Sequence, residues 1–255
     1  MPTALVTGAT AGIGESFTRL LAAKGFDLVL VARDKKRLQE RANLLSKKYK
    51  VDVEVLQADL SVPAQLAKVA KRLSNPKKPI EVLINNAGFG IKDSFLASNI
   101  TDEILLMDVL AKAPMQLMHA VLPQMLRRDS GTIINVSSVA SFIAGGTYSA
   151  AKSYLTVHTE SLHTELSNTN INISALCPGF THTEFHQRGK MKMSGLPNFM
   201  WLEADRVVAD SWQAAMAGKA ICIPGWQYKI LSTIARFGPR PLVRKLGIKV
   251  RARQR

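Results

Sequence analysis

The sequence lacks several features that define particular classes of protein. It has no run of the roughly 18 consecutive apolar residues that a bilayer-spanning helix needs. Its first residues lead directly into a strand-like segment, without the charged flank or cleavage site of a signal peptide. These absences predict a cytoplasmic protein. Cysteine is also scarce, and Cys177 and Cys222 both lie in apolar runs, which favours reduced, buried thiols over a disulfide framework or a metal cluster.

Two families of catalytic motif are also missing. The N-terminal glycines are not followed by Gly-Lys-Ser/Thr, because Glu15 and Ser16 follow Gly14, and this argues against an NTPase P-loop. Ser149 and Lys152 do form a Ser-x-x-Lys pair, but its companions Ser-Asp-Asn and Lys-Thr-Gly and the Gly-x-Ser-x-Gly elbow are absent. We therefore interpret Ser149 as a small residue that lets its helix pack closely against a neighbour.

Acidic residues are missing from the C-terminal part of the chain. The net charge is +15, yet residues 225–255 hold nine Lys or Arg and no Asp or Glu, which leaves 25 basic and 19 acidic residues before them. Apolar residues recur among these cations, first at helical spacing and then after a proline: Ile230, Leu231, Ile234, Phe237, Leu242, Val243, Leu246 and Ile248. This pattern suits a helix lying on an anionic membrane. Docking to a partner subunit and a solvated basic extension are open alternatives, whereas nucleic-acid binding is disfavoured because no recognised binding module accompanies the charge.

Short β-branched runs alternate with amphipathic, helix-length segments along the rest of the chain. Seven runs indicate strands, at residues 4–8, 27–32, 51–59, 80–88, 131–138, 171–179 and 220–225. Strands that are apolar on both faces and joined by helices predict a Rossmann-type, doubly wound α/β fold, with a parallel seven-stranded sheet covered by helices on both faces. With no internal repeat or low-complexity linker, we expect one domain over residues 1–224 and a basic amphipathic tail over 225–255.

Glycines follow the first predicted strand in the pattern G-x-x-x-G-x-G, at Gly8, Gly12 and Gly14. Ligands of such sheets bind at the carboxyl ends of the strands. Glycines at this turn let the backbone approach a pyrophosphate closely, and the N-terminus of the next helix meets its negative charge. The pattern therefore predicts a dinucleotide site.

The end of the second strand predicts which dinucleotide binds. A carboxylate there would accept hydrogen bonds from a free ribose, whereas Arg33 would accommodate a 2′-phosphate through its charge and planar donor fork. We expect NADP(H) rather than NAD(H). Arg33 could instead be the first member of a solvated basic run, and Asp34 could compete with it. Asp59, at the end of the third strand, is expected either to accept from the adenine amino group or to cap the next helix.

Six motifs occur in an order that is specific when they are taken together: TGATAGIG at 7–14, ADL at 58–60, NNAG at 85–88, NVSS at 135–138, YSAAK at 148–152 and CPGFTHT at 177–183. Over residues 3 to about 224 the chain resembles the short-chain dehydrogenase/reductase family. Within that family it looks most like the DltE-like or ketoacyl-reductase-like branch of bacterial oxidoreductases.

The resemblance implies a set of cofactor-binding residues. Its members are Gly8, Thr10, Gly12, Ile13 and Gly14 for the pyrophosphate and adenosine, Asp59 and Leu60 for the adenine, Asn86, Ala87 and Gly88 along the cofactor, and Pro178, Gly179, Thr181 and Thr183 toward the nicotinamide carboxamide. It also implies that Ser138, Tyr148 and Lys152 are the catalytic serine, tyrosine and lysine. Family members are commonly homodimers or homotetramers through the helices that carry Leu110 and Tyr148.

The chemistry of these residue types supports the implied roles. Tyr148 and Lys152 are four residues apart and share one helix face. A nearby ammonium is expected to lower the pKa of the phenol from about 10 toward the working pH, which suits general acid/base catalysis. Lys152 can also hold the nicotinamide ribose, and Ser138 can hydrogen-bond the substrate oxygen. Because the connection to Tyr148 is short, the adjacent Ser137 stays an alternative to Ser138.

The chain departs from the family at Leu110. Many relatives carry asparagine there, which bends the helix and holds a water of the proton relay to the lysine, and leucine offers no polar group. We expect an NADP(H)-dependent oxidoreductase that acts on a carbonyl/alcohol pair with a slower or rerouted proton supply. The alternative is a cofactor-binding or scaffold protein on the same fold.

Residues at about 182–201 correspond to the family's variable substrate lid. Apolar residues in it could form a wall for a lipophilic ketone, aldehyde or alcohol, or could pack the lid or a subunit contact: Met191, Met193, Leu196, Phe199, Met200 and Trp201. His182 and His186 are four residues apart, but without a His-Glu-x-x-His motif or a clear third ligand we predict no metal site.

Overall fold

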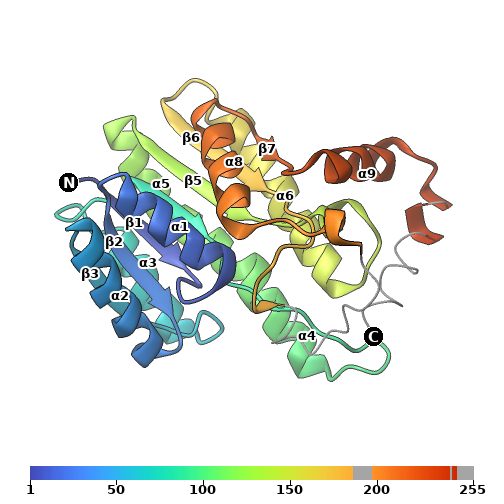
Figure 1. The fold of residues 1–255 in the computed structure, drawn as a ribbon, viewed down its shortest axis with the longest axis horizontal. Helices are drawn as coiled ribbons and strands as arrows, with labels where there is room; N and C mark the ends of the chain where they lie inside the picture. Colours follow the sequence, from blue (N-terminus) through green and yellow to red (C-terminus); the bar gives the residue numbers. More distant parts are fainter. Residues whose placement is uncertain (186–196, 242, 246–255) are drawn as a thin grey trace.

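The computed structural model describes residues 1–185, 197–241 and 243–245. Its centre is a seven-stranded parallel sheet in the order β3-β2-β1-β4-β5-β6-β7 (Figure 1). The strands are β1 (Thr3–Thr7), β2 (Asp27–Ala32), β3 (Val53–Gln57), β4 (Val82–Asn85), β5 (Gly131–Val136), β6 (Ile171–Leu176) and β7 (Ile221–Cys222). All seven predicted strands form, so the prediction of a doubly wound α/β fold is confirmed.

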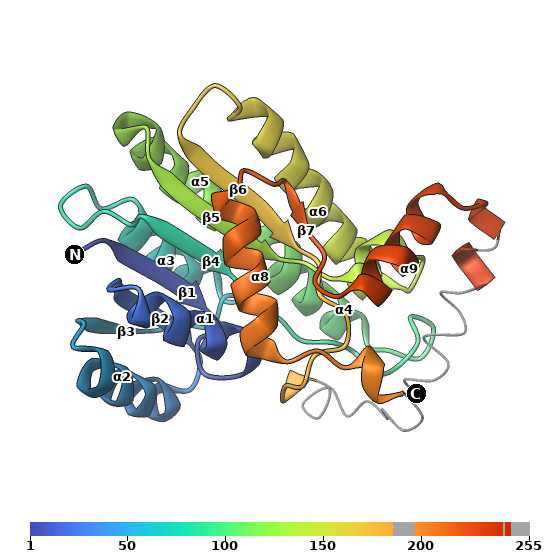
Figure 2. The same cartoon turned by 45° about the horizontal axis from the view of Figure 1, so that its top comes forward.

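Helices cover both faces of this sheet (Figure 2). One face packs against α1 (Gly12–Ala23), α2 (Lys35–Tyr49) and α8 (Ala204–Met216), and the other against α3 (Pro63–Leu73), α5 (Ala113–Arg128) and α6 (Thr147–Glu165). Successive strand residues point to opposite faces. Val6 of β1 accordingly belongs to the first core, whereas its neighbour Leu5 belongs to the second. This is why the strands are apolar at nearly every position.

One long helical stretch is interrupted by a π-helical turn. It comprises α4 (Ile100–Met107), the turn η1 (Asp108–Lys112) and α5. Among the described residues, Ile100–Arg128 is long and apolar enough to cross a bilayer by length and composition, but 44% of its most apolar window is buried inside the protein. Its inner face packs against α3 and α6, as in a core helix of an α/β fold.

Three further helical elements follow the carboxyl ends of the last strands. They are η2 (Val139–Phe142), η3 (Asn198–Met200) and α9 (Trp226–Phe237). The helix expected near Ile230 therefore forms, and it begins immediately after β7. Leu242, Leu246 and Ile248 lie outside the described residues. Cys177 and Cys222 are both free and buried, as expected for reduced thiols.

Candidate active site

A cavity of about 800 Å³ opens at the carboxyl ends of the strands. Its lining includes every residue that the sequence analysis assigned to catalysis or to the cofactor, with one exception. The exception is Gly14, where an added Cβ would lie 2.3 Å from the carbonyl oxygen of Gly8. Gly14 therefore allows α1 to pack closely against the turn before it, behind the cavity wall.

The turn between β1 and α1 forms one end of the cavity. Gly8 and Gly12 have φ angles of +66° and +55°, a region that disfavours residues with a Cβ. An added Cβ at Gly12 would also lie 2.9 Å from Thr183. Asn86 ties this turn to β4, because its Nδ2 donates to the carbonyl oxygens of Thr7 at 2.9 Å and Gly8 at 3.2 Å. The tight turn is thus fixed from a second strand.

The start of α1 fits the pyrophosphate of a dinucleotide. Ala11, Gly12 and Ile13 line the cavity, and no side chain caps the N-terminus of the helix. The first backbone N–H groups of a helix have no partner within the helix, and together with the helix dipole they favour an anion. This donor set, in a cradle that a Cβ would fill, matches the predicted dinucleotide chemistry.

Arg33, Asp34 and Asp59 lie together at the next part of the wall. The Asp34 carboxylate caps α2 by accepting from the Arg37 backbone N–H at 3.0 Å, so it serves the helix. Arg33 is 73% exposed at its side chain and lies 4.0 Å from Asp59 Oδ2. Burial raises the pKa of Asp59, but hydrogen bonds from Ser61 and the charge of Arg33 outweigh it, so the net shift is downward. Asp59 is therefore held ionised beside a solvent-facing guanidinium.

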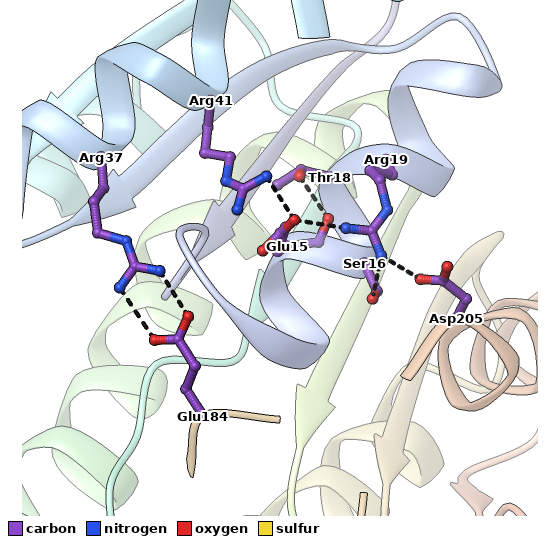
Figure 3. A network of polar contacts seen from close by, with 8 residues as sticks. All are labelled: Glu15, Ser16, Thr18, Arg19, Arg37, Arg41, Glu184 and Asp205. Atoms are coloured by element: carbon purple, nitrogen blue, oxygen red, sulfur yellow. Dashed lines mark hydrogen bonds and ion pairs between the residues drawn. The ribbon is translucent and has the colours of Figure 1, made fainter. Parts of the chain in front are cut away.

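An ion pair joins α2 to the segment after β6 (Figure 3), and both of its residues line the cavity. The Arg37 guanidinium donates to both oxygens of Glu184, at 2.7 and 3.1 Å. Close by, Glu15 of α1 accepts from Arg19 and Arg41, each at 2.7 Å. Sequence reasoning missed the Arg37–Glu184 pair, since 147 residues separate its members.

The structure distinguishes the two adjacent serines at the end of β5. Ser137 is buried, and its hydroxyl hydrogen-bonds the Lys152 carbonyl oxygen at 2.9 Å and Thr156 Oγ1 at 2.7 Å. Ser138 caps η2 by accepting from Ala140 N at 3.1 Å, and its hydroxyl also hydrogen-bonds Tyr148. Ser137 therefore holds α6 against the sheet, whereas Ser138 lies beside the phenol.

Tyr148 and Lys152 lie on the same face of α6, with Lys152 Nζ 5.9 Å from the centre of the Tyr148 ring. Lys152 is buried, and its Nζ donates to Val136 O at 2.6 Å. Burial lowers the pKa of Lys152 to about 8. Burial also raises the pKa of Tyr148 to about 12, although the hydrogen bond with Ser138 acts in the opposite direction. The expectation that the ammonium lowers the phenol pKa is wrong here, because loss of solvation dominates.

Leu110, where the family resemblance implies an asparagine, carries no polar group. It is buried in a small apolar cluster with Leu106, Val109 and Ala151, and Tyr148 packs against that cluster. Its Cδ2 atom lies 2.7 Å from where a Cβ of Gly88 would stand. The helix still contains a π-helical turn at Asp108–Lys112, so the irregularity forms here without an asparagine.

Comparison with known proteins identifies the family. The family model of the short chain dehydrogenases matches residues 2–193, which is most of the chain. The chain belongs to the short-chain dehydrogenase family. This confirms the family resemblance found in the sequence, while the narrower DltE-like branch stays a prediction.

Several relatives share most of the length of this short-chain dehydrogenase. An NADP-dependent 3-hydroxy acid dehydrogenase of Schizosaccharomyces pombe is 36% identical over 72% of this chain and 73% of the relative. A short-chain dehydrogenase from Sphingobium yanoikuyae, solved with NADPH, is 34% identical, with a TM-score of 0.85 over 91% of this chain and 93% of its own. A bulky-bulky ketone specific alcohol dehydrogenase from Comamonas testosteroni is 30% identical, with a TM-score of 0.80 over 91% of each chain. The chain is thus an oxidoreductase of this family.

In this family member the cavity wall includes α9, which the sequence analysis assigned to the tail. Tyr228, Leu231, Ser232 and Ala235 all line the cavity. The Tyr228 ring packs directly against Gly179. A Cβ added at Gly179 would lie only 2.0 Å from the Tyr228 Cζ atom. The spacing of these α9 residues, which recur every three or four positions, was the available signal. Only Leu231 among them is named in the sequence analysis, which places it with the apolar residues of the tail.

Of the predicted lid, the structure describes residues 182–185 and 197–201. Met200 lines the cavity, and Trp201 stacks on His182 with 4.7 Å between ring centres. Met191, Met193, Leu196 and His186 lie outside the described residues. Within 1–185, 197–241 and 243–245, no three His, Cys, Asp or Glu side chains gather where they could hold a metal.

Proposed function

We propose that this short-chain dehydrogenase is an NADP(H)-dependent enzyme acting on a carbonyl/alcohol pair. One observation carries the proposal: a single cavity joins the Gly8–Gly12 turn and Arg33 to Ser138, Tyr148 and Lys152. The NADP-dependent relative from fission yeast and the NADPH complex from Sphingobium support this choice of cofactor over NAD(H).

The proposed roles follow from the chemistry of the side chains. When bound, NADP(H) supplies or accepts the hydride. Ser138 donates a hydrogen bond to the substrate oxygen, and the Tyr148 hydroxyl gives that oxygen a proton during reduction. Because burial raises its pKa to about 12, Tyr148 stays protonated at neutral pH and is ready to donate. Lys152 holds the nicotinamide ribose and the positive charge beneath the phenol.

We further propose that the substrate is lipophilic. The catalytic end of the cavity is lined largely by hydrocarbon and aromatic side chains, including Phe89, Ile91, Val139, Ile143, Phe185 and Met200. Such walls favour an apolar body, with a few polar groups to orient the reacting carbonyl. The similarity to an alcohol dehydrogenase specific for bulky-bulky ketones points the same way.

Oxidation of NADPH with a panel of aryl and alkyl ketones tests the function. We expect the wild type to turn over at least one of these ketones. The turnover rate should fall roughly 100-fold or more in Tyr148→Phe, because the general acid is removed. Tyr154→Phe is the matched control, since Tyr154 lies on the same helix but is exposed. Tight NADPH binding without oxidation by any ketone, or equal rates in Tyr148→Phe and wild type, would instead favour a cofactor-binding scaffold protein.

Binding titrations test the cofactor separately from the chemistry. Arg33→Ala is expected to raise the Kd for NADPH and to leave the Kd for NADH unchanged, since only the former carries the 2′-phosphate. Lys68→Ala on α3 removes the same charge from an exposed residue outside the cavity lining. An equal Kd for NADPH in Arg33→Ala and the wild type would contradict the proposed role of Arg33.

The remaining proposals concern organisation. We propose one domain over residues 1–224 and a basic segment over 225–255, whose helix α9 packs against the cavity of that domain. We also propose a homodimer or homotetramer and a cytoplasmic location.

A further inference from the structure

Helix α9 presents two different apolar surfaces. Its inner face buries Tyr228, Ser232 and Ala235 and faces the cavity. A second stripe, which we call the outer stripe, consists of Trp226, Ile230, Ile234 and Phe237, at spacings of four, four and three residues. The exposed fraction of these residues lies between 43% and 81%. Figure 1 shows α9 at the edge of the molecule, extending away from the sheet. The outer stripe therefore faces away from the core that holds the helix in place.

Hydrogen bonds fix the orientation of α9 on the catalytic body. The Tyr228 hydroxyl accepts from Phe180 N at 3.0 Å and donates to the carbonyl oxygen of Met200. Gln227 donates to the carbonyl oxygen of Phe199 at 2.8 Å, and the Phe199 residue is itself exposed. Whatever binds the outer stripe of α9 is thus held beside the cavity.

Leu231 links the outer stripe to the cavity. It lines the cavity and is also 44% exposed, so it lies at the rim. An apolar molecule passing from the outer stripe into the cavity would remain in contact with hydrocarbon at this point.

The charge around α9 identifies the kind of surface that fits it. Residues 225–255 contain nine Lys or Arg and no acidic residue. Lys229, Arg240, Arg244 and Lys245 are exposed, whereas Arg236 pairs with Glu160 at 3.7 Å. A 12-residue helix is roughly 18 Å long, too short to span a bilayer but long enough to lie in its interface. Exposed apolar residues flanked by cations are the pattern of a helix that binds anionic lipid.

We propose that the outer stripe of α9 seats this protein on an anionic lipid bilayer, with the rim at Leu231 facing the lipid. The substrate would then be a membrane-dissolved ketone or alcohol that enters the cavity directly from the bilayer. This second part rests on the proposed oxidoreductase function, whereas the first part does not.

Flotation of the full-length protein with vesicles tests the seating. We expect binding to vesicles of phosphatidylcholine mixed with phosphatidylglycerol, little binding to phosphatidylcholine alone, and release at about 1 M salt, where charges are screened within about 3 Å. Two double variants should each weaken vesicle binding roughly tenfold or more. One removes apolar residues, Ile230→Ser/Phe237→Ser, and the other removes cations, Lys229→Ser/Arg240→Ser.

Matched substitutions elsewhere control for the loss of any apolar or basic residue. Leu44→Ser/Leu126→Ser removes exposed apolar residues from α2 and α5, and Lys68→Ser/Lys71→Ser removes exposed cations from α3. These variants should bind as the wild type does. Equal losses in the α9 variants and the controls, or no preference for anionic lipid, would overturn the seating. So would α9-dependent binding to RNA, or α9-dependent self-association in place of vesicle binding.

Fluorescence shows whether the stripe enters the hydrocarbon. Vesicles with brominated acyl chains should quench part of the tryptophan emission, and Trp226→Phe should abolish that part because Trp226 begins the exposed stripe. Quenching that persists in Trp226→Phe would contradict insertion of this stripe.

Substrate delivery is measured with two ketones of the same reacting group, one water-soluble and one with a long alkyl chain. Anionic vesicles should accelerate NADPH oxidation with the long-chain ketone only. Ile230→Ser/Phe237→Ser should lose that acceleration and keep the wild-type rate on the water-soluble ketone, because neither residue lines the cavity. Vesicle binding without acceleration would overturn the delivery step. Absence of turnover with both ketones would refute the proposed function, while the flotation result would still decide the seating.

Discussion

The side-chain amine of Lys152 is buried, and burial lowers the pKa of Lys152 from 10.5 to about 8. Between these two values the unfolded chain binds more protons at this group than the folded chain does. The contribution of Lys152 to stability therefore rises as the pH increases from about 8 to 10.5. Below this window, folding must bury a charge that the unfolded chain leaves in water.

Substitution of Lys152 by methionine removes this pH dependence. Between pH 7 and 10.5, the free energy of unfolding of the wild type should gain roughly 3 kcal/mol relative to Lys152→Met. Denaturant titrations of both proteins at the two pH values measure the change. Lys47→Met, at an exposed site on α2, should show no such change relative to the wild type. A constant difference between wild type and Lys152→Met would show that burial does not shift this lysine.

Leu110 places hydrocarbon where the family resemblance implies an amide side chain. Leu110→Asn should raise turnover and change its solvent isotope effect if proton supply to Lys152 limits the rate. It should also destabilise the fold by about 2–4 kcal/mol, because an amide replaces a buried leucine. Leu106→Asn is the control, since Leu106 lies in the same buried cluster and should destabilise without changing the isotope effect. An unchanged turnover and isotope effect in Leu110→Asn would show that the missing relay is not limiting.

At the scale of elements, α9 depends on the contact between Gly179 and the Tyr228 ring. Gly179→Ala should lower the free energy of unfolding by about 1–3 kcal/mol, because its Cβ would stand 2.0 Å from the ring. In a Tyr228→Ala background the same substitution should cost much less, since the ring is gone. Thermal or denaturant unfolding of the four proteins in this double-mutant cycle measures the coupling. Additive losses would mean that the backbone at Gly179, rather than the ring, sets the cost.

At the scale of the whole molecule, α4 and α6 pack together and expose large apolar residues, including Ile104 and Val157. The family resemblance implies an oligomer through the helical segments that carry Leu110 and Tyr148, and α4 leads directly into the first of them. We therefore expect this surface to join two copies of the chain. Ile104→Lys/Val157→Lys should shift sedimentation toward the monomer, because charges would be buried at the contact. Leu44→Lys, on the exposed side of α2, should leave the sedimentation coefficient unchanged. A monomeric wild type would contradict this expectation.

The sequence by itself determined the features that depend on local geometry. β-branched runs that are apolar on both faces predicted the strands of the sheet, and the glycines of the Gly8–Gly12 turn predicted the turn. The four-residue spacing of Tyr148 and Lys152 predicted their shared helix face. Each of these follows from backbone dihedral angles and helical or strand periodicity, which act over a few residues.

Tertiary structure alone decided what depends on burial and on partners far apart in the chain. It turned Ser137 toward α6 and Ser138 toward the phenol, and it raised the pKa of Tyr148 where the sequence had suggested a decrease. It also joined Arg37 to Glu184 and made α9 a wall of the cavity. Solvation and long-range pairing are set by how the elements pack. Spacing within one segment can show that residues share a helix face, but it does not show what that face packs against.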